Sequence, residues 1–104
     1  MKRYSIITEN FNRCLVCGTY CNIHKHEIFF GRGKRELSIK YGLVVPLCGR
    51  HHNMSNDGVH FNRKLDLELK QLGQKAFEYK YPNLNFLDIF HRNYLYEEEA
   101  NDSI

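Results

Sequence analysis

Two pairs of potential metal ligands frame the first half of this chain, and each pair has two residues between its members: Cys14 with Cys17, and Cys48 with His51. Structural zinc takes four thiolate or imidazole ligands in a tetrahedron, usually supplied as two pairs by two close turns. A chain of 104 residues without tryptophan buries only a modest core, so a bound metal would add folding free energy that such a core lacks. The spacing therefore predicts a structural zinc site. Cys21 leaves an alternative open, because it could replace one of these ligands or be a small buried thiol.

Length and composition indicate one small globular domain, which we place at residues 1–104. Apolar residues make up 42% and charged residues 26% of the chain. No stretch approaches the eighteen or more apolar residues of a membrane span, and the first ten residues build no signal-peptide core. We therefore expect a cytoplasmic, intracellular protein with no membrane partner, in which reduced thiols bind metal.

Charge is unevenly distributed along the chain. Residues 1–52 contain nine Lys and Arg against three Asp and Glu, a balance of +6, whereas residues 53–104 contain six against nine, a balance of −3. The basic surplus lies in the half with the Cys pairs, which suits a polyanionic partner such as nucleic acid. The same surplus is compatible with an ordinary soluble protein, so charge alone does not decide between the two.

Hydrophobic periodicity predicts an α+β domain, in which a zinc knuckle clamps the two ends of a β-hairpin and helices follow. The core of this domain is expected to span residues 14–80. The expected segments are an extended lead-in (1–13), a Cys knuckle (14–18), a strand (22–30), a flexible basic loop (31–36), a second strand (41–47), a helix (62–79), a C-terminal helix (86–96) and an acidic tail (97–104).

The long helix is predicted from a single apolar stripe with helical spacing. Asn62 is expected to cap its first turn, and Tyr81-Pro82 to end it. We expect the stripe to face the core. Its members, at spacings of 4, 4, 3, 4 and 3 residues, are Phe61, Leu65, Leu69, Leu72, Ala76 and Tyr79.

Four stretches carry the Cys and His residues in a characteristic order: Cys14-Leu-Val-Cys17, His24-Lys-His26-Glu27-Ile-Phe-Phe-Gly31, Leu43-Val-Val-Pro-Leu-Cys48-Gly-Arg-His51-His52-Asn53 and Gly58-Val-His60-Phe-Asn62. Together they resemble the HNH nuclease superfamily, in particular its small phage and bacterial members. The resemblance runs from Cys14 to about Phe77 and implies a ββα-metal (His-Me finger) fold. The turn from Leu47 to His52 would open the helix of that fold. The family's middle Asn has no counterpart near Gly42-Leu43.

This resemblance implies a metal-dependent endonuclease that hydrolyses DNA phosphodiester bonds with one divalent ion besides the zinc. A base on the first strand would take the proton of the attacking water, and the ion would offset charge on the phosphoryl oxygens. His52 and His60 would hold that ion, which manganese or nickel suits better than magnesium unless a carboxylate takes part. If Ile28 fixes the register, Glu27 is the base and His26 a metal ligand. If the register shifts by one residue, His26 is the base, which we favour because imidazole titrates near neutrality.

Five basic residues are expected near the hairpin, where they would hold the DNA backbone without reading its sequence. The alternative function is a zinc-stabilised nucleic-acid-binding or recombination-accessory module, in which the missing Asn marks lost catalysis. A small interaction protein that keeps the zinc hairpin as a scaffold is a third possibility. A binding module needs the basic residues but not a convergence of His26, His52 and His60. The five candidate DNA contacts are Lys25, Arg32, Lys34, Arg35 and Arg50.

Overall fold

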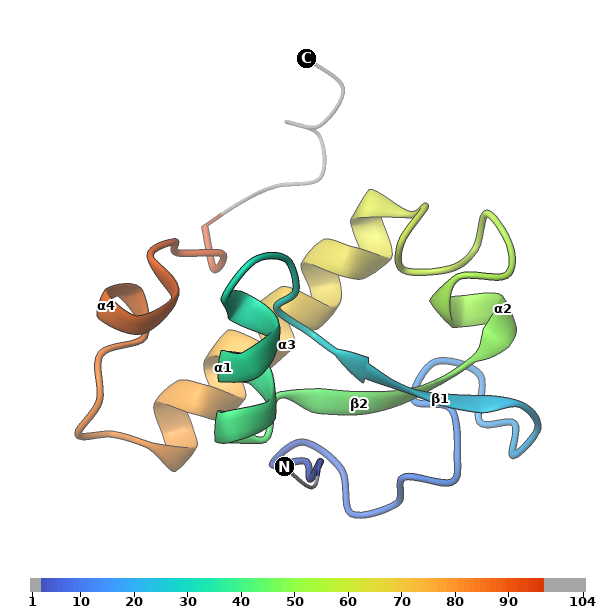
Figure 1. Ribbon diagram of the computed structural model, residues 1–104, viewed down its shortest axis with the longest axis horizontal. Coiled ribbons are helices and arrows are strands. Elements are labelled where there is room, and N and C mark those ends of the chain that lie inside the picture. The colour runs from blue at the N-terminus through green and yellow to red at the C-terminus, as the bar shows by residue number, and fades with distance from the viewer. Residues whose placement is uncertain (1–2, 97–104) are drawn as a thin grey trace.

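A two-stranded antiparallel sheet lies at the centre of the fold, and a helix is inserted between its strands. The computed structural model describes residues 3–96, so the expected acidic tail (97–104) lies outside the described residues. Figure 1 shows α2 at one end of the sheet and α1 and α4 towards the other. The α+β class is confirmed. The elements run β1 (Ile23–Glu27), α1 (Lys34–Tyr41), β2 (Val44–Cys48), α2 (Gly49–His52), α3 (Arg63–Lys80) and α4 (Phe86–Phe90).

The pairing of the two strands places the histidines of β1. His24 lies opposite Leu47 and His26 opposite Val45. Because side chains alternate along a strand, His24 and His26 point to the same face of β1. The first strand is shorter than the expected 22–30, and the second starts later than the expected 41–47. Ile28 and Phe29 leave the sheet and are fully buried in the core.

A helix replaces the flexible basic loop expected over residues 31–36, so that prediction is wrong. Helix α1 (Lys34–Tyr41) begins after Gly33 and ends at Gly42, both with left-handed backbone angles. Its Ser38 is fully buried. The Ser38 hydroxyl accepts a hydrogen bond from the Phe29 N–H (3.0 Å) and donates one to the Phe29 carbonyl (2.7 Å). This pair of bonds docks α1 on the chain that leaves β1, so the two strands are not joined by a simple hairpin turn.

The long helix is confirmed, but the face that it buries is not the one we expected. Helix α3 begins after Asn62, whose side chain accepts a hydrogen bond from the Leu65 N–H (3.2 Å). Of the predicted stripe, Leu69 is buried and Leu65 packs partly against the core, while Leu72 is 41% and Tyr79 is 89% exposed. Besides Leu69, the residues that α3 buries are Leu67, Gly73, Gln74 and Phe77, none of which belongs to the predicted stripe.

Two residues explain the rotated face of α3. A side chain at Gly73 would come within 3.1 Å of the Phe29 ring and 3.2 Å of Ile28, so glycine lets the helix approach these two side chains without crowding. Gln74 is buried because its amide is satisfied there. Its Oε1 accepts from the Tyr94 N–H (2.9 Å) and its Nε2 donates to Asn93 (3.1 Å). These bonds hold the C-terminal segment against α3.

The C-terminal helix is shorter than the expected 86–96. Helix α4 ends at His91, which adopts a left-handed backbone conformation (φ 66°). The chain then turns back so that Tyr94 enters the core. The Phe29 ring lies 5.3 Å, 4.8 Å and 5.3 Å from the rings of Phe86, Phe90 and Tyr94, between centroids. None of the helices within residues 3–96 combines the length and the apolar character needed to cross a membrane.

Candidate metal centres

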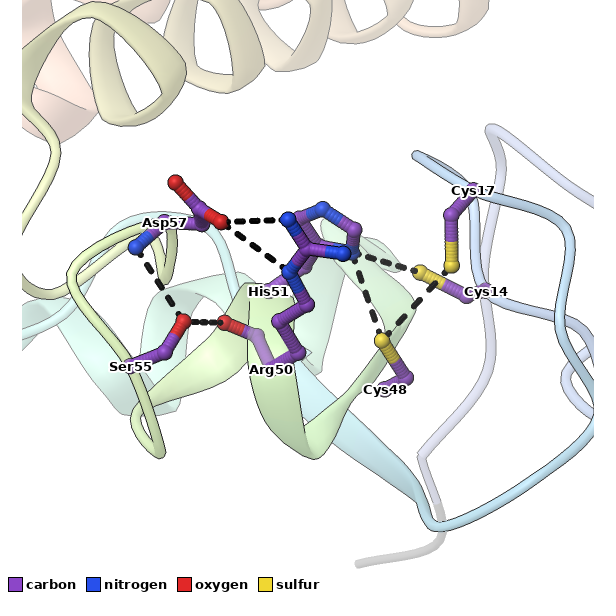
Figure 2. A network of polar contacts seen from close by, with 7 residues as sticks. All are labelled: Cys14, Cys17, Cys48, Arg50, His51, Ser55 and Asp57. Atoms are coloured by element: carbon purple, nitrogen blue, oxygen red, sulfur yellow. Dashed lines mark hydrogen bonds and ion pairs between the residues drawn. The ribbon is translucent and has the colours of Figure 1, made fainter.

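The two ligand pairs predicted from their spacing come together at one end of the sheet. The first pair lies on the turn after the lead-in, where the Gly18 N–H donates to the Cys14 carbonyl (2.9 Å). The second pair lies at the end of β2 and in α2. The ligand atoms of all four residues lie within 4.8 Å of one another. Figure 2 shows the three sulfurs gathered beside the His51 ring.

The separations of these ligand atoms match a tetrahedral zinc site. The Nδ1 atom of His51 lies 3.3 Å from the Cys48 sulfur and 3.9 Å from the Cys14 sulfur, and the sulfurs of Cys17 and Cys48 are 3.7 Å apart. With zinc bonds of about 2.3 Å to sulfur and about 2.0–2.1 Å to nitrogen, the tetrahedral edges would be about 3.8 Å between sulfurs and about 3.6 Å between sulfur and nitrogen. The cluster of three cysteines and one histidine could therefore hold a metal such as zinc.

The surroundings of Cys14 favour its thiolate form, which is the form that binds metal. Burial of Cys14 opposes ionisation. The backbone hydrogen bonds that its sulfur makes with Cys17, Cys48 and Val16 outweigh that effect, and the pKa of Cys14 is lowered to about 6. Cys21 is an exposed free thiol outside the cluster, so it is neither a buried thiol nor one of the four clustered ligands.

The loop after α2 folds back on this short helix and brings a further histidine to the site. The Val59 N–H donates to the His51 carbonyl (2.8 Å) and the His60 N–H to the His52 carbonyl (3.2 Å). A side chain at Gly58 would lie 2.7 Å from the His52 carbonyl oxygen, so this close return requires glycine. The fold-back therefore places His60 beside His52, although eight residues separate them.

A second cluster consists of three imidazole rings. His26 from β1, His52 from α2 and His60 from the returning loop bring one ring nitrogen each to within 4.8 Å of the others. The Nε2 atoms of His52 and His60 are 3.2 Å apart. Two nitrogens bound to one ion at about 2.0–2.1 Å would be roughly 2.9–3.4 Å apart in octahedral or tetrahedral geometry. The spacing of this pair thus fits a shared ion.

His26 is the most enclosed member of this histidine cluster. Its side chain is 2% exposed, and its Nε2 atom has no hydrogen-bond partner among the described residues. A buried polar atom without a partner is costly, and a ligand that uses its lone pair would remove that cost. Burial, followed by the nearby His52 and His60, lowers the pKa of His26 to about 3. Burial and the neighbouring His60 and His24 lower the pKa of His52 to about 4. Both rings are therefore neutral near pH 7, as ligands must be.

A fourth histidine, His24, contacts the cluster and was absent from the predicted site. Its Nδ1 atom lies 2.8 Å from the Nδ1 atom of His52. One of these two atoms must carry the proton. If His52 uses its Nε2 lone pair toward an ion, its own Nδ1 is the donor and His24 the acceptor. His24 then fixes the tautomer and orientation of a ligand. The sequence signal was its two-residue spacing from His26 on a strand.

Glu27 adjoins the histidine cluster, and arginines hold its carboxylate. Its Oε2 atom lies 2.9 Å from Arg3 Nε and its Oε1 atom 3.4 Å from Arg35 Nη1, and its side chain is 7% exposed. Glu27 lines the same cavity, of about 230 Å³, as the histidine cluster. The cavity is lined by Lys25, His26, Glu27, Phe30, Arg35, His52, Asn53 and His60.

The five predicted DNA contacts have different surroundings in the structure. Lys25 and Arg35 line the histidine cavity. Arg32 is exposed and Lys34 half-buried at the start of α1. Arg50 lies beside the cysteine cluster, where its guanidinium binds Asp57 Oδ2 at 2.7 Å and 3.0 Å (Figure 2). The pKa of Arg50 is raised by that hydrogen bond, so its charge is engaged within the protein.

Comparisons of the chain with models of protein families, with curated proteins and with solved structures gave no match. The two clusters are therefore interpreted from their own chemistry. One is rich in sulfur and ties the first turn to the end of the sheet, and the other is built from imidazole at the floor of a cavity with cationic walls. Centres of the first kind stabilise folds, whereas centres with open coordination positions can act on substrates.

Proposed function

We propose that this protein is a metal-dependent endonuclease that hydrolyses phosphodiester bonds in DNA, as the resemblance to HNH nucleases implied. The observation that carries this proposal is the convergence of three imidazoles in a cavity whose walls include two cations, with His26 buried and its Nε2 atom without a hydrogen-bond partner among the described residues. A structural scaffold has no use for such a convergence. Zinc is assigned to the cysteine cluster, where it would stabilise the fold.

In this proposal the catalytic ion is manganese or nickel, and it binds His26, His52 and His60. Three imidazole ligands suit such transition ions better than magnesium. A bound ion supplies Lewis acidity for a phosphoryl oxygen and lowers the pKa of a water molecule. Lys25 and Arg35 at the cavity wall would hold the scissile phosphate by its charge.

The proposed base changes from His26 to Glu27. An ordinary imidazole titrates near neutrality, which favoured His26 as the base, but burial lowers the pKa of His26 to about 3. As a member of the imidazole trio, His26 is better suited to bind the ion, and Glu27 is the carboxylate that lines the same cavity. Arg3 and Arg35 would fix the orientation of Glu27. The same two ion pairs favour the alternative, a nucleic-acid-binding module without catalysis, since they engage both oxygens of the candidate base.

A plasmid-nicking assay separates the two functions. Purified protein is incubated with supercoiled plasmid and manganese, nickel or magnesium, with omission of divalent ion and excess EDTA as controls. We expect nicking that depends on the added ion. His60→Ala should raise the concentration of ion needed for half-maximal nicking, while His91→Ala, an exposed histidine outside both clusters, should not change it. No cleavage of duplex, single-stranded or branched DNA under any of these conditions would leave only the binding module.

A further inference from the structure

A second cavity, of about 280 Å³, lies next to the histidine cavity, and Phe30 lines both. Its lining residues come from three segments that are far apart in the sequence: the chain after β1, the first half of α3 and the chain after α4. Phe30 belongs to one of the four stretches that carry the Cys and His residues. None of the other lining residues was singled out from the sequence as part of a site. The lining residues are Phe30, Arg63, Asp66, Leu67, Lys70, Arg92 and Tyr94.

Positive charge and aromatic rings dominate the walls of this cavity. Arg63, Lys70 and Arg92 line it together with one carboxylate, that of Asp66. The Lys70 ammonium lies 2.8 Å from Asp66 Oδ2 and 5.7 Å from the centre of the Tyr94 ring. The Arg92 guanidinium lies 5.1 Å from the same ring. Cations gathered in a concave site with apolar walls raise the local concentration of anions.

The second cavity is one aromatic ring away from the candidate catalytic ion. The centre of the Phe30 ring lies 5.0 Å from that of His60 and 5.7 Å from that of His26. The Lys70 ammonium lies 4.6 Å from the centre of the same Phe30 ring. A polyanion whose phosphate reached the histidines would therefore bring its neighbouring unit to Lys70.

We propose that this second cavity binds one unpaired nucleotide of the DNA strand, next to the phosphate held at the histidine cluster. Arg63, Lys70 and Arg92 would hold its phosphate, and the rings of Phe30 and Tyr94 would contact its base and sugar. The inference rests on the proposed function, since its ligand is the strand that crosses the ion. A volume of about 280 Å³ is just below the roughly 300 Å³ at which pockets for drug-sized ligands begin, so it suits one unit of a polymer.

The nucleotide must be unpaired because a base inside a concave pocket has left the duplex stack. Aromatic rings accept any base in this way, while cations follow the backbone, which is how proteins hold single strands with little sequence preference. The structure thus favours single-stranded or branched DNA over a continuous duplex as the substrate.

The test measures oligonucleotide binding at several salt concentrations. Fluorescence anisotropy of a labelled 12-nucleotide single strand and of the matching duplex is recorded without added divalent ion. The variant is Arg63→Gln with Arg92→Gln, two exposed residues of the cavity. The matched control is Lys75→Gln with Lys80→Gln, exposed residues of α3 that do not line this cavity. Thermal melts check that both double variants keep the wild-type fold.

We expect the salt dependence of single-strand binding to become weaker in the Arg63→Gln and Arg92→Gln double variant (the cavity variant) and to stay unchanged in the control. Each lost phosphate contact lowers the magnitude of the slope of log K against log salt by about 0.7, so the loss of two contacts lowers it by about 1.4. At 0.1 M salt this decrease corresponds to about 25-fold weaker binding of the single strand. The preference of the wild type for the single strand over the duplex should fall with it. Equal slopes in the two double variants would refute the inference, and so would a wild type that binds neither oligonucleotide.

Plasmid nicking is measured on the same protein preparations, so that the nuclease proposal and the nucleotide-binding proposal can be refuted independently. If the wild type nicks DNA and the two double variants bind alike, the nuclease stands and the nucleotide site is refuted. If the wild type does not nick and the cavity variant alone loses slope, the cavity is a nucleotide-binding site and the catalytic proposal is refuted.

Discussion

Replacing Cys17 with serine should cost this protein much of its stability, because Cys17 is one of four ligands in the cysteine cluster. Structural zinc contributes about 10–16 kcal/mol to folding of small zinc domains, so an equal share for each of the four ligands is about 3 kcal/mol. In a domain of this size, 1 kcal/mol shifts Tm by about 4–8 °C, so Tm should fall by roughly 12–24 °C. The loss should be large because the turn that carries Cys14 and Cys17 has few other ties to the sheet, such as the Leu15 N–H to the Pro46 carbonyl (2.9 Å).

Cys21→Ser is the matched control, since it makes the same chemical change four residues away on another exposed thiol. Thermal melts followed by circular dichroism, with zinc content measured by mass spectrometry, compare the two variants. Cys21→Ser should keep one zinc per chain and a stability within about 0.5 kcal/mol of the wild type. If Cys21→Ser lost the zinc while Cys17→Ser kept it, the reasoning about the ligand set would be wrong.

Further predictions concern the base, a buried serine and pH. Glu27→Gln should reduce nicking by on the order of a hundredfold or more, while His26→Ala should raise the ion concentration needed for half-maximal nicking; the reverse pattern would return His26 to the role of base. Ser38→Ala should lower the free energy of unfolding by about 1–3 kcal/mol in a urea titration, because it leaves the buried N–H and carbonyl of Phe29 unpaired; no loss would mean that other groups satisfy them. His26 has a pKa of about 3 in the fold against an ordinary 6.5, so the unfolded chain binds the extra proton between these values. Without an ion at the histidine cluster, stability should fall as pH drops from 6.5 towards 3, by about 1.4 kcal/mol per pH unit for this group. His26→Leu should flatten that dependence, and an unchanged slope would assign it to other groups.

The cysteine cluster could be predicted from sequence because its ligands come in two local pairs. A spacing of two residues places both members of a pair on one turn, and the only long-range step needed was that the turns meet. The same holds for the start of α3, where Asn62 caps the helix by a bond to Leu65, three residues away. These features depend on residues that are close together in the sequence, so they can be predicted from it.

Features decided by distant contacts were missed. Helix α1 is anchored by hydrogen bonds between Ser38 and Phe29, and its basic first turn, which follows Gly31 and Gly33, resembles a loop when read alone. The buried face of α3 depends on Gly73 and Gln74, which do not count as apolar in a periodicity analysis. A glycine that admits Phe29 and an amide that binds the segment at Tyr94 are recognisable only once their partners are known.

The candidate catalytic site was predicted in part. His26, His52 and His60 were named, but the role of His26 depended on a register that the sequence left open. His24 was missed, although it follows the same alternation along β1. The second cavity could not be predicted, since three separate segments build it and only Phe30 among its lining residues belongs to the four stretches that carry the Cys and His residues.

Zinc is proposed for the cysteine cluster and a different divalent ion for the histidine cluster. Anomalous diffraction tests this assignment of metals most directly. Crystals of the protein purified with zinc are soaked in manganese, and data are collected at the zinc edge and at a wavelength where manganese scatters anomalously. We expect a zinc peak between His51 Nδ1 and the sulfurs of Cys14, Cys17 and Cys48, and a manganese peak at the Nε2 atoms of His26, His52 and His60. Zinc at the cysteine cluster with no ion at the three histidines at any manganese concentration would contradict the assignment of a catalytic centre.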